Sequence, residues 1–320
     1  MYLLRPCLLF VASALLLIAG CSKDDKPADP PAPPVSDTLP AGWSLVKLNR
    51  TLLDVFFVDE NTGYVCGVNY VAKSTNGGTT WTELKFQSDS LSFQNMFFSD
   101  ANTGWTIGNE INGLKRFLFR TTDGGTSWKK IPLPGNFLDI QFLSKSLGYG
   151  ISGQQLYLSS DSGNTWKSTS GHIEGPAVAL FFVDPSNGWV AGGFKISVTK
   201  DGGKSFTVQN SQYNGAASGM QFIDANQGWI PAQDGIYRTS NSGSTWELTP
   251  LHDGSVDVHF FNGNEGYALE DHTVRKSITG GKSFTREFSV SERFIELHFT
   301  DPKHGWVVTY EGSIYRYIQP

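Results

Sequence analysis

Acidic side chains recur at one position of a repeating sequence unit, and they are the first candidates for chemistry. The position opens the expected innermost strand of each unit, and in five of seven units it holds a carboxylate or an amide, at Asp54, Asn95, Asp139, Asp257 and Glu296. Carboxylates held close together raise one another's pKa unless a cation or a basic partner neutralises them. We therefore consider these residues a candidate site for a cation or a sugar. The alternative is a solvated rim at which water satisfies each group.

Two of these acids are followed, two residues later, by a histidine. The segments are Asp257-Val258-His259 and Glu296-Leu297-His298, and the alternation of a strand puts each acid and its histidine on the same side. Carboxylate and imidazole groups are ligands for zinc and other transition metals. The corresponding sides of successive units face different gaps between neighbouring units, however, so the four side chains need not converge on one point. We therefore predict no cofactor and keep His259 and His298 as the positions at which a metal would be sought.

The composition excludes some function classes. The chain has 320 residues and a formal net charge of −5, so it lacks the basic stripe that a nucleic-acid groove needs. It contains 9 Trp, 11 Tyr, 22 Phe and 35 Gly, which favours a large core and many tight turns. Of its three cysteines, only Cys66 lies outside the N-terminal segment, so no internal disulfide is expected.

The N-terminus has the form of a targeting segment. An apolar stretch from Cys7 to Ile18 follows the single charge of Arg5, which is typical of a signal peptide and too short for a membrane span. Ile18-Ala19-Gly20-Cys21 resembles the lipobox of bacterial lipoproteins, in which the cysteine is lipidated and becomes the new N-terminus. We predict a signal peptide at residues 1–20 and lipidation of Cys21. An ordinary signal peptide with an incidental cysteine is the alternative.

Residues 21–41 are predicted to be a tether. Residues 22–41 contain six of the fifteen prolines, and such a segment favours an extended, semi-rigid spacer. Ser22-Lys23-Asp24-Asp25 resembles an export tag of Gram-negative lipoproteins. The predicted location is therefore the cell envelope, as an outer-membrane lipoprotein attached only through its lipid. Surface display and a periplasm-facing anchor both stay open.

Residues 42–320 consist of seven repeats of about 40 residues. A glycine followed by an aromatic residue recurs at Gly63-Tyr64, Gly104-Trp105, Gly148-Tyr149, Gly188-Trp189, Gly228-Trp229, Gly266-Tyr267 and Gly305-Trp306. Each unit contains four short strand patterns, which is typical of a propeller blade. The last unit stops after its third strand at Ile318, and a strand beginning at Trp43 precedes the first unit. The sequence therefore predicts an all-β, seven-bladed β-propeller whose N-terminal strand completes the last blade, and we expect a monomer.

A second motif connects the third and fourth strands of six units. It contains Asn76, Asp123, Asp161, Asp201 or Asn241 within Ser/Thr-x-Asp/Asn-x-Gly-x-Ser/Thr-aromatic, and Thr279 replaces the acid in the last copy. A short Asp or Asn side chain accepts hydrogen bonds from its own turn, and glycine supplies the positive φ. We expect a hairpin clasp at each copy, and a looser turn at Thr279.

These residues resemble the Asp-box, or BNR, repeat of sialidases, sortilin-type receptors and photosystem II assembly-factor propellers. The longer pattern, Phe-x-Asp-x-x-x-Gly-Trp followed by Asp-Gly-Gly-x-Thr-Trp, is most similar to the photosystem II assembly-factor group. The resemblance covers residues 42–320. It implies that the boxes are structural and that the protein is a scaffold for a protein partner, such as an assembly factor for a membrane complex. Arginines on the expected binding face are few, namely Arg50, Arg116 and Arg293.

Longer loops are expected on the face at which the innermost strands begin, and loops on rigid scaffolds carry recognition. The predicted partner contacts are exposed side chains in these loops: Phe86, Arg116, Phe117, His172, Glu174 and Tyr213.

Catalytic groups of known hydrolases are not evident. Sialidases usually carry Arg-Ile-Pro near the N-terminus, and the nearest match is Lys130-Ile131-Pro132, well along the chain. A nucleophile elbow and Cys-x-x-Cys pairs are absent. We therefore predict a lipid-anchored, non-enzymatic propeller that binds a protein partner or an envelope glycan and has no catalytic residue. The alternative is a glycosidase or a lectin that uses the acidic rim.

Overall fold

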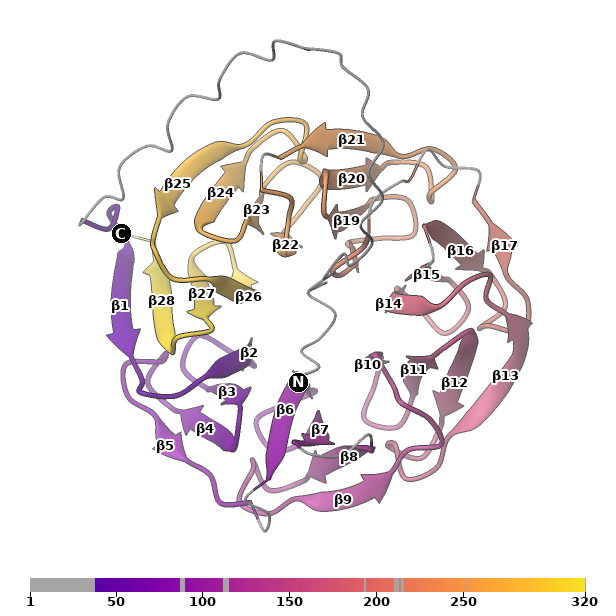
Figure 1. Cartoon of the computed structure of the whole chain (residues 1–320), viewed down its shortest axis with the longest axis horizontal. Helices are drawn as coiled ribbons and strands as arrows, with labels where there is room; N and C mark the ends of the chain where they lie inside the picture. The colour runs from indigo at the N-terminus through magenta and orange to yellow at the C-terminus, as the bar shows by residue number, and fades with distance from the viewer. Residues whose placement is uncertain are drawn as a thin grey trace, which may run out of the picture.

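The structure is a ring of seven four-stranded antiparallel sheets. The computed structural model describes residues 38–86, 90–111, 115–192, 194–209, 213, 216–251 and 253–319. Figure 1 shows the seven sheets arranged around a common centre, and the described residues contain strands but no helix. The predicted seven-bladed β-propeller is therefore confirmed. The predicted signal peptide, Cys21 and nearly all of the tether lie outside the described residues, and no described segment forms a helix able to cross a membrane.

Each blade runs from the centre of the ring outward. The innermost strands of blades one to seven are β2 (Leu52–Phe57), β6 (Leu91–Phe98), β10 (Asp139–Phe142), β14 (Ala177–Phe182), β18 (Gln221–Phe222), β22 (Asp257–Phe260) and β26 (Phe294–Asp301). The second strands are β3 (Gly63–Gly67), β7 (Gly104–Glu110), β11 (Gly148–Ser152), β15 (Gly188–Gly192), β19 (Gly228–Ala232), β23 (Gly266–Leu269) and β27 (His304–Thr309).

The outer half of each blade consists of a third strand and an outermost strand, and most residues of the outermost strands are exposed. The third strands are β4 (Tyr70–Ser74), β8 (Arg116–Thr121), β12 (Gln155–Ser159), β16 (Lys195–Thr199), β20 (Gly235–Thr239), β24 (Thr273–Ser277) and β28 (Ser313–Ile318). The outermost strands are β5 (Thr82–Glu83), β9 (Lys129–Pro132), β13 (Lys167–His172), β17 (Thr207–Val208), β21 (Glu247–Pro250), β25 (Thr285–Ser289) and, in blade seven, β1 (Trp43–Lys47).

The glycine of each Gly-aromatic pair lets a ring pack against the backbone. A Cβ on Gly63 would lie 2.3 Å from the ring of Phe57, and the other six glycines face the phenylalanine of their own innermost strand at similarly short range. No larger residue fits there without moving that ring. The repeated glycine is thus explained by space within the blade.

The aromatic residue of each pair joins one blade to the next. Tyr64 of blade one stacks on Phe98 of blade two, with ring centroids 3.7 Å apart, and Trp306 of blade seven stacks on Phe57 of blade one at 3.5 Å. The same stack occurs at the other five interfaces. Because these rings are buried, the column forms a core layer that continues around the ring.

The Asp-box is a clasp at the end of the third strand in blades one to six. In blade two, Oδ1 of Asp123 accepts a hydrogen bond from the backbone N–H of Ser127 at 2.9 Å, and Gly125 takes a φ of +88°. The hydroxyl of Ser127 donates to the same carboxylate, which holds the pKa of Asp123 below its usual value. Asn76, Asp161, Asp201 and Asn241 occupy the same place in their blades.

The box without an acid keeps the same turn. Oγ1 of Thr279 accepts from the backbone N–H of Ser283 at 3.0 Å, and Oγ of Ser277 accepts from the N–H of Gly281 at 2.9 Å. A hydroxyl oxygen therefore replaces the carboxylate oxygen at this position, and the expectation of a looser turn is wrong.

The two ends of the propeller meet in blade seven. Strand β1 pairs with β28 from Trp43 opposite Tyr317 to Lys47 opposite Ser313, which gives the sheet order β1-β28-β27-β26. Figure 1 shows β1 and β28 side by side near the C-terminus. The predicted ring closure is confirmed.

Candidate functional site

The antiparallel order defines two faces of the ring. One face carries the loops that lead into the innermost strands and the turns between second and third strands, and we call it the loop face. The opposite face carries the Asp-box turns. Polar groups predicted to take part in binding lie at the loop-face end of the innermost strands.

The acidic residues of the innermost strands connect neighbouring blades. Oδ2 of Asp54 accepts a hydrogen bond from the backbone N–H of Met96 in the next blade at 2.6 Å. Oδ2 of Asp139 accepts from the N–H of Leu180 at 3.0 Å, and Oδ2 of Asp257 accepts from the N–H of Leu297 at 3.1 Å. One oxygen of each carboxylate is thus used to hold two innermost strands together.

The two remaining rim residues differ from this pattern. Nδ2 of Asn95 donates to Oδ1 of Asp139 at 2.9 Å, and Asn95 is buried with a φ of +52°. Glu296 is half-buried at the corresponding position of blade seven. Asp54 is buried, whereas Asp139 and Asp257 are half-buried. The rim acids therefore differ in their access to a ligand, and a role in binding a cation or sugar stays a prediction.

The two predicted histidines do come together. The rings of His259 in β22 and His298 in β26 lie 5.9 Å apart, and the ring of His298 also lies 4.5 Å from that of Phe56. Burial lowers the pKa of His259 to about 3, with a further contribution from His298, and burial lowers the pKa of His298 to about 4. Both rings are therefore neutral at pH 7.

These histidines do not belong to a metal cluster. Nε2 of His298 lies 2.9 Å from the carbonyl oxygen of Phe57, so this nitrogen bonds to the neighbouring blade. Within the described ranges, no group of three or more His, Cys, Asp or Glu side chains is arranged to hold a metal ion.

Three of the predicted partner contacts are less accessible than expected. Tyr213 is only 2% exposed and its ring packs 4.9 Å from that of Tyr237, so the prediction of an exposed Tyr213 is wrong. Phe86 is half-buried against the ring of Phe93 at 4.4 Å. Phe117 is also half-buried, and Nζ of Lys130 covers its ring at 3.6 Å.

Some residues that were predicted to lie in loops lie at the ends of strands instead. Arg116 and Phe117 begin β8, and His172 ends β13, because the strands extend further than their apolar patterns indicated. The Arg116 guanidinium donates to the carbonyl oxygen of Phe137, and burial lowers its pKa. His172 and Glu174 are exposed as expected, and Glu174 pairs with Lys195.

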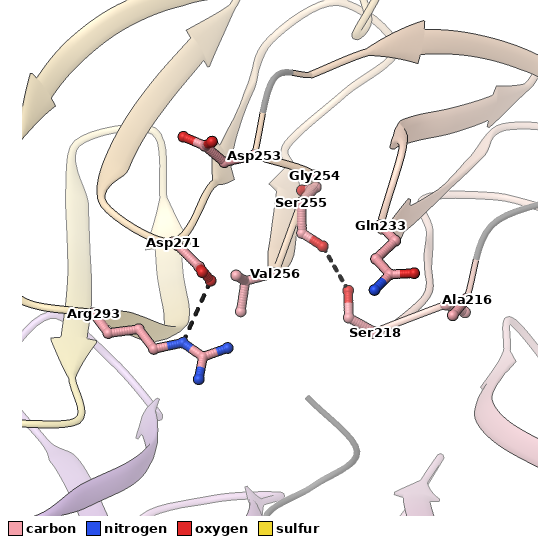
Figure 2. Close-up of a pocket in the computed structure, with 10 residues that line it drawn as sticks. Ala216, Ser218, Gln233, Asp253, Gly254, Ser255, Val256, Asp271 and Arg293 are labelled. Carbon is pink, nitrogen blue, oxygen red and sulfur yellow. Dashed lines mark hydrogen bonds and ion pairs between the residues drawn. The ribbon is translucent and has the colours of Figure 1, made fainter. Parts of the chain in front are cut away.

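A pocket on the loop face contains residues that the sequence analysis mostly missed. It has a volume of about 170 Å³ and lies where blades five, six and seven meet (Figure 2). Its lining includes Ser218, Gln233, Asp253, Ser255, Asp271 and Arg293. Only Arg293 had been singled out, as one of the few arginines on this face. No local signal marks the others, because they come from four separate loops and turns.

The chain matches the family model described as photosynthesis system II assembly factor YCF48, over residues 35–137 and 133–251. It is 30% identical over 135 residues to the chloroplastic photosystem II stability/assembly factor HCF136 of Oryza sativa subsp. japonica, covering 37% of this chain. It is 27% identical over 137 residues, 40% of this chain, to the photosystem II assembly lipoprotein Ycf48 of Synechococcus sp. (strain CC9902). The matches span 30% and 40% of these relatives' own lengths.

Solved structures show the same fold. A structure of YCF48 bound to a D1 peptide has a TM-score of 0.72 and 24% identity, covering 90% of this chain and 99% of that chain. A glycoside hydrolase of family GH74 from Niastella koreensis has a TM-score of 0.63 and 15% identity, covering 85% of this chain and 43% of that chain. The fold is thus shared by binding proteins and enzymes, and the family model matches more than half of the chain. The chain belongs to the YCF48 family of photosystem II assembly-factor propellers.

Proposed function

We propose that this protein is a lipid-anchored, non-enzymatic propeller that binds a segment of a membrane protein and assists the assembly of a membrane complex. The observation that carries the proposal is the family match over residues 35–251, to a family described as an assembly factor. A propeller of this family has been solved with a peptide bound. The stacked aromatic interfaces and the closed ring provide the rigid scaffold on which such a partner would dock.

The proposal places the protein in the cell envelope, attached to the outer membrane through Cys21. Ile18-Ala19-Gly20-Cys21 and the proline-rich residues 22–41 support this location. Metabolic labelling with an alkyne fatty acid tests it, since labelling is expected in the natural chain and lost in Cys21→Ala. Equal labelling of both chains would contradict lipidation of this cysteine.

Cross-linking of the intact lipoprotein in its native cells tests the partner. We expect mass spectrometry to identify a reproducible membrane-protein neighbour cross-linked to the loop face. Recovery of polysaccharide alone would contradict the proposal. In that case polysaccharide cleavage, abolished by Asp139→Asn or Asp257→Asn in a folded protein, would establish the glycosidase alternative, and binding without cleavage would indicate a lectin.

A further inference from the structure

Three blades contribute side chains to the pocket on the loop face, and one of these side chains, that of Arg293, is positively charged. Ser218 and Gln233 come from blade five, Asp253 and Ser255 from the loop that leads into β22, and Asp271 from the turn between β23 and β24. Arg293 comes from the loop that leads into β26. Arg293 is the only cationic residue among the described side chains that line the pocket.

Arg293 is held firmly by its backbone. Its N–H donates to Oε2 of Glu311 at 3.1 Å, and its carbonyl oxygen accepts from the N–H of Tyr310 at 2.9 Å. The next residue is also fixed, because the N–H of Phe294 donates to the carbonyl oxygen of Asp271 at 2.8 Å. The side chain therefore starts from a fixed point, which reduces the entropy lost when it binds a ligand.

The guanidinium of Arg293 has one weak intramolecular contact. Its Nε lies 3.4 Å from Oδ1 of Asp271, and its side chain is 34% exposed. Figure 2 shows Nε joined to Asp271, with the two terminal nitrogens on the other side of the guanidinium carbon and joined to none of the residues drawn. Within the described part of the chain, neither terminal nitrogen forms a hydrogen bond that would block it.

Of the other polar side chains, two serines lie in the wall of the pocket, and a glutamine and an aspartate lie at its exposed rim. Oγ of Ser218 donates to the carbonyl oxygen of Ser255 at 2.9 Å, and Oγ of Ser255 donates to that of Leu269 at 3.1 Å, so both hydroxyl protons are used within the wall. Gln233 and Asp253 are exposed at the rim. They can accept hydrogen bonds from peptide N–H groups, and the Gln233 amide can also donate to a peptide carbonyl.

The chemistry of the guanidinium determines the ligand class. Two terminal N–H groups in a planar fork match a carboxylate, and this bidentate pair is stronger than a bond between neutral groups. A volume of about 170 Å³ is smaller than the roughly 300 Å³ at which drug-sized sites begin, and it suits a single side chain. None of the described residues that line the pocket is aromatic, so among them a sugar ring finds no surface on which to stack.

We propose that this pocket binds the carboxylate of an aspartate or glutamate side chain in an extended segment of the protein partner. The inference rests on the proposed function and deepens it, because it specifies one residue type in the partner and the place at which that residue docks. Arg293 binds the carboxylate, while Gln233 and Asp253 contact the peptide groups on either side of it.

The test uses a blocked glutamate residue, N-acetyl-glutamate-N-methylamide, titrated into the full chain labelled with ¹⁵N and followed by NMR. We expect saturable shifts, and no saturable shifts with the neutral glutamine analogue. Arg293→Ala is expected to weaken binding about tenfold or more, as for loss of a hydrogen bond to a charged group. Arg286→Ala, which removes the same charge from exposed β25, is the matched control and leaves the affinity unchanged.

Arg293→Lys keeps the charge but removes the fork, and we expect weaker binding in a chain with an unchanged unfolding midpoint. It therefore keeps the inference testable if Arg293→Ala does not fold. Equal binding of the glutamine analogue, equal loss in Arg286→Ala, or preferential binding of glucuronate would each overturn the inference. If cells carrying Arg293→Ala yield the same cross-linked partner in the same amount, the proposed function stands and the pocket inference fails. If the glutamate probe binds at Arg293 but no partner is cross-linked in cells, the pocket binds a carboxylate and the proposed function fails.

Discussion

Carboxylates at the start of the innermost strands act across blade interfaces. Asp54, Asp139 and Asp257 each accept a backbone N–H from the following blade. Two residues after the same position in blades three and five, the amide of Gln141 or Gln221 bonds to both the N–H and the carbonyl oxygen of the next blade's phenylalanine. At the residue scale, polar side chains near the centre thus take the place of backbone pairing between sheets.

The buried position of Asp54 leads to a stability prediction. We expect Asp54→Ala to lower the free energy of unfolding by about 1–3 kcal/mol, because the N–H of Met96 loses its acceptor in a buried place. Urea denaturation followed by tryptophan fluorescence measures the change. Asp253→Ala, at an exposed acid, serves as the control and should stay within about 0.5 kcal/mol. Equal effects of both substitutions would contradict the structural role of Asp54.

The histidine pair predicts a loss of stability in acid. An unfolded histidine gains a proton near pH 6.5, whereas His259 and His298 have pKa values of about 3 and about 4 in the fold. Between pH 6.5 and about 4 the unfolded chain binds more protons, so stability falls as the pH falls. The same strands also carry Asp257 and Glu296, but neither is among the causes of these two shifts.

His298→Gln should remove part of this acid sensitivity while keeping the fold. Glutamine already bonds to the next blade at Gln141 and Gln221, the corresponding positions of blades three and five. Unfolding midpoints at pH 7 and pH 4.5 provide the measurement. We expect a smaller difference between the two midpoints in the variant, and a difference as large as that of the natural chain would show that His298 is not responsible.

At the scale of the element, the Asp-box closes a short hairpin through several hydrogen bonds, and the turn forms even in the box that has no acid. The buried hydroxyl at the start of the box accepts the N–H of the second glycine, as Oγ1 of Thr121 does from Gly125 at 2.9 Å. The same bond is present in the box that carries Thr279. The hydroxyl before the turn therefore contributes to the clasp beside the acid after which the motif is named.

Thr121→Val tests this hydroxyl with little change of shape. It leaves the buried N–H of Gly125 without an acceptor, and we expect a loss of about 1–3 kcal/mol in the free energy of unfolding. The neighbouring Thr122 is exposed, so Thr122→Val should have an effect below about 0.5 kcal/mol. Chemical denaturation distinguishes the two variants, and a neutral Thr121→Val would be evidence against the role of the hydroxyl.

At the scale of the whole molecule, β1 joins the two ends of the propeller. Trp43 is 7% exposed and packs 4.8 Å from the ring of Phe288 in blade six, and Nζ of Lys47 lies 2.6 Å from Oε1 of Glu292. Without β1, strand β28 would be an exposed edge. The N-terminal strand therefore covers an edge and packs against the adjacent blade.

Removal of residues 42–48 should destabilise the whole ring. We expect the thermal midpoint to fall by more than about 10 °C, since loss of a buried tryptophan alone costs roughly 3–5 kcal/mol. A deletion of residues 22–37 is the control, because it leaves β1 and its partners in place and should not change the midpoint. Trp43→Ala provides a folded intermediate case, and an unchanged midpoint in the 42–48 deletion would refute closure by β1.

Repetition in the sequence was sufficient to predict the blade number, the strand count and the closure. Each Gly-aromatic pair and each box acts within one blade or between two adjacent blades, so the pattern of one unit describes all seven. Lipidation of Cys21, the role of residues 21–41 as a tether and the envelope location stay predictions, because Cys21 and nearly all of the tether lie outside the described residues. The burial of Tyr213 and the pocket around Arg293 were not predictable. They depend on how loops of different length from separate blades fold together, and local propensities do not encode the distances between residues far apart in the chain.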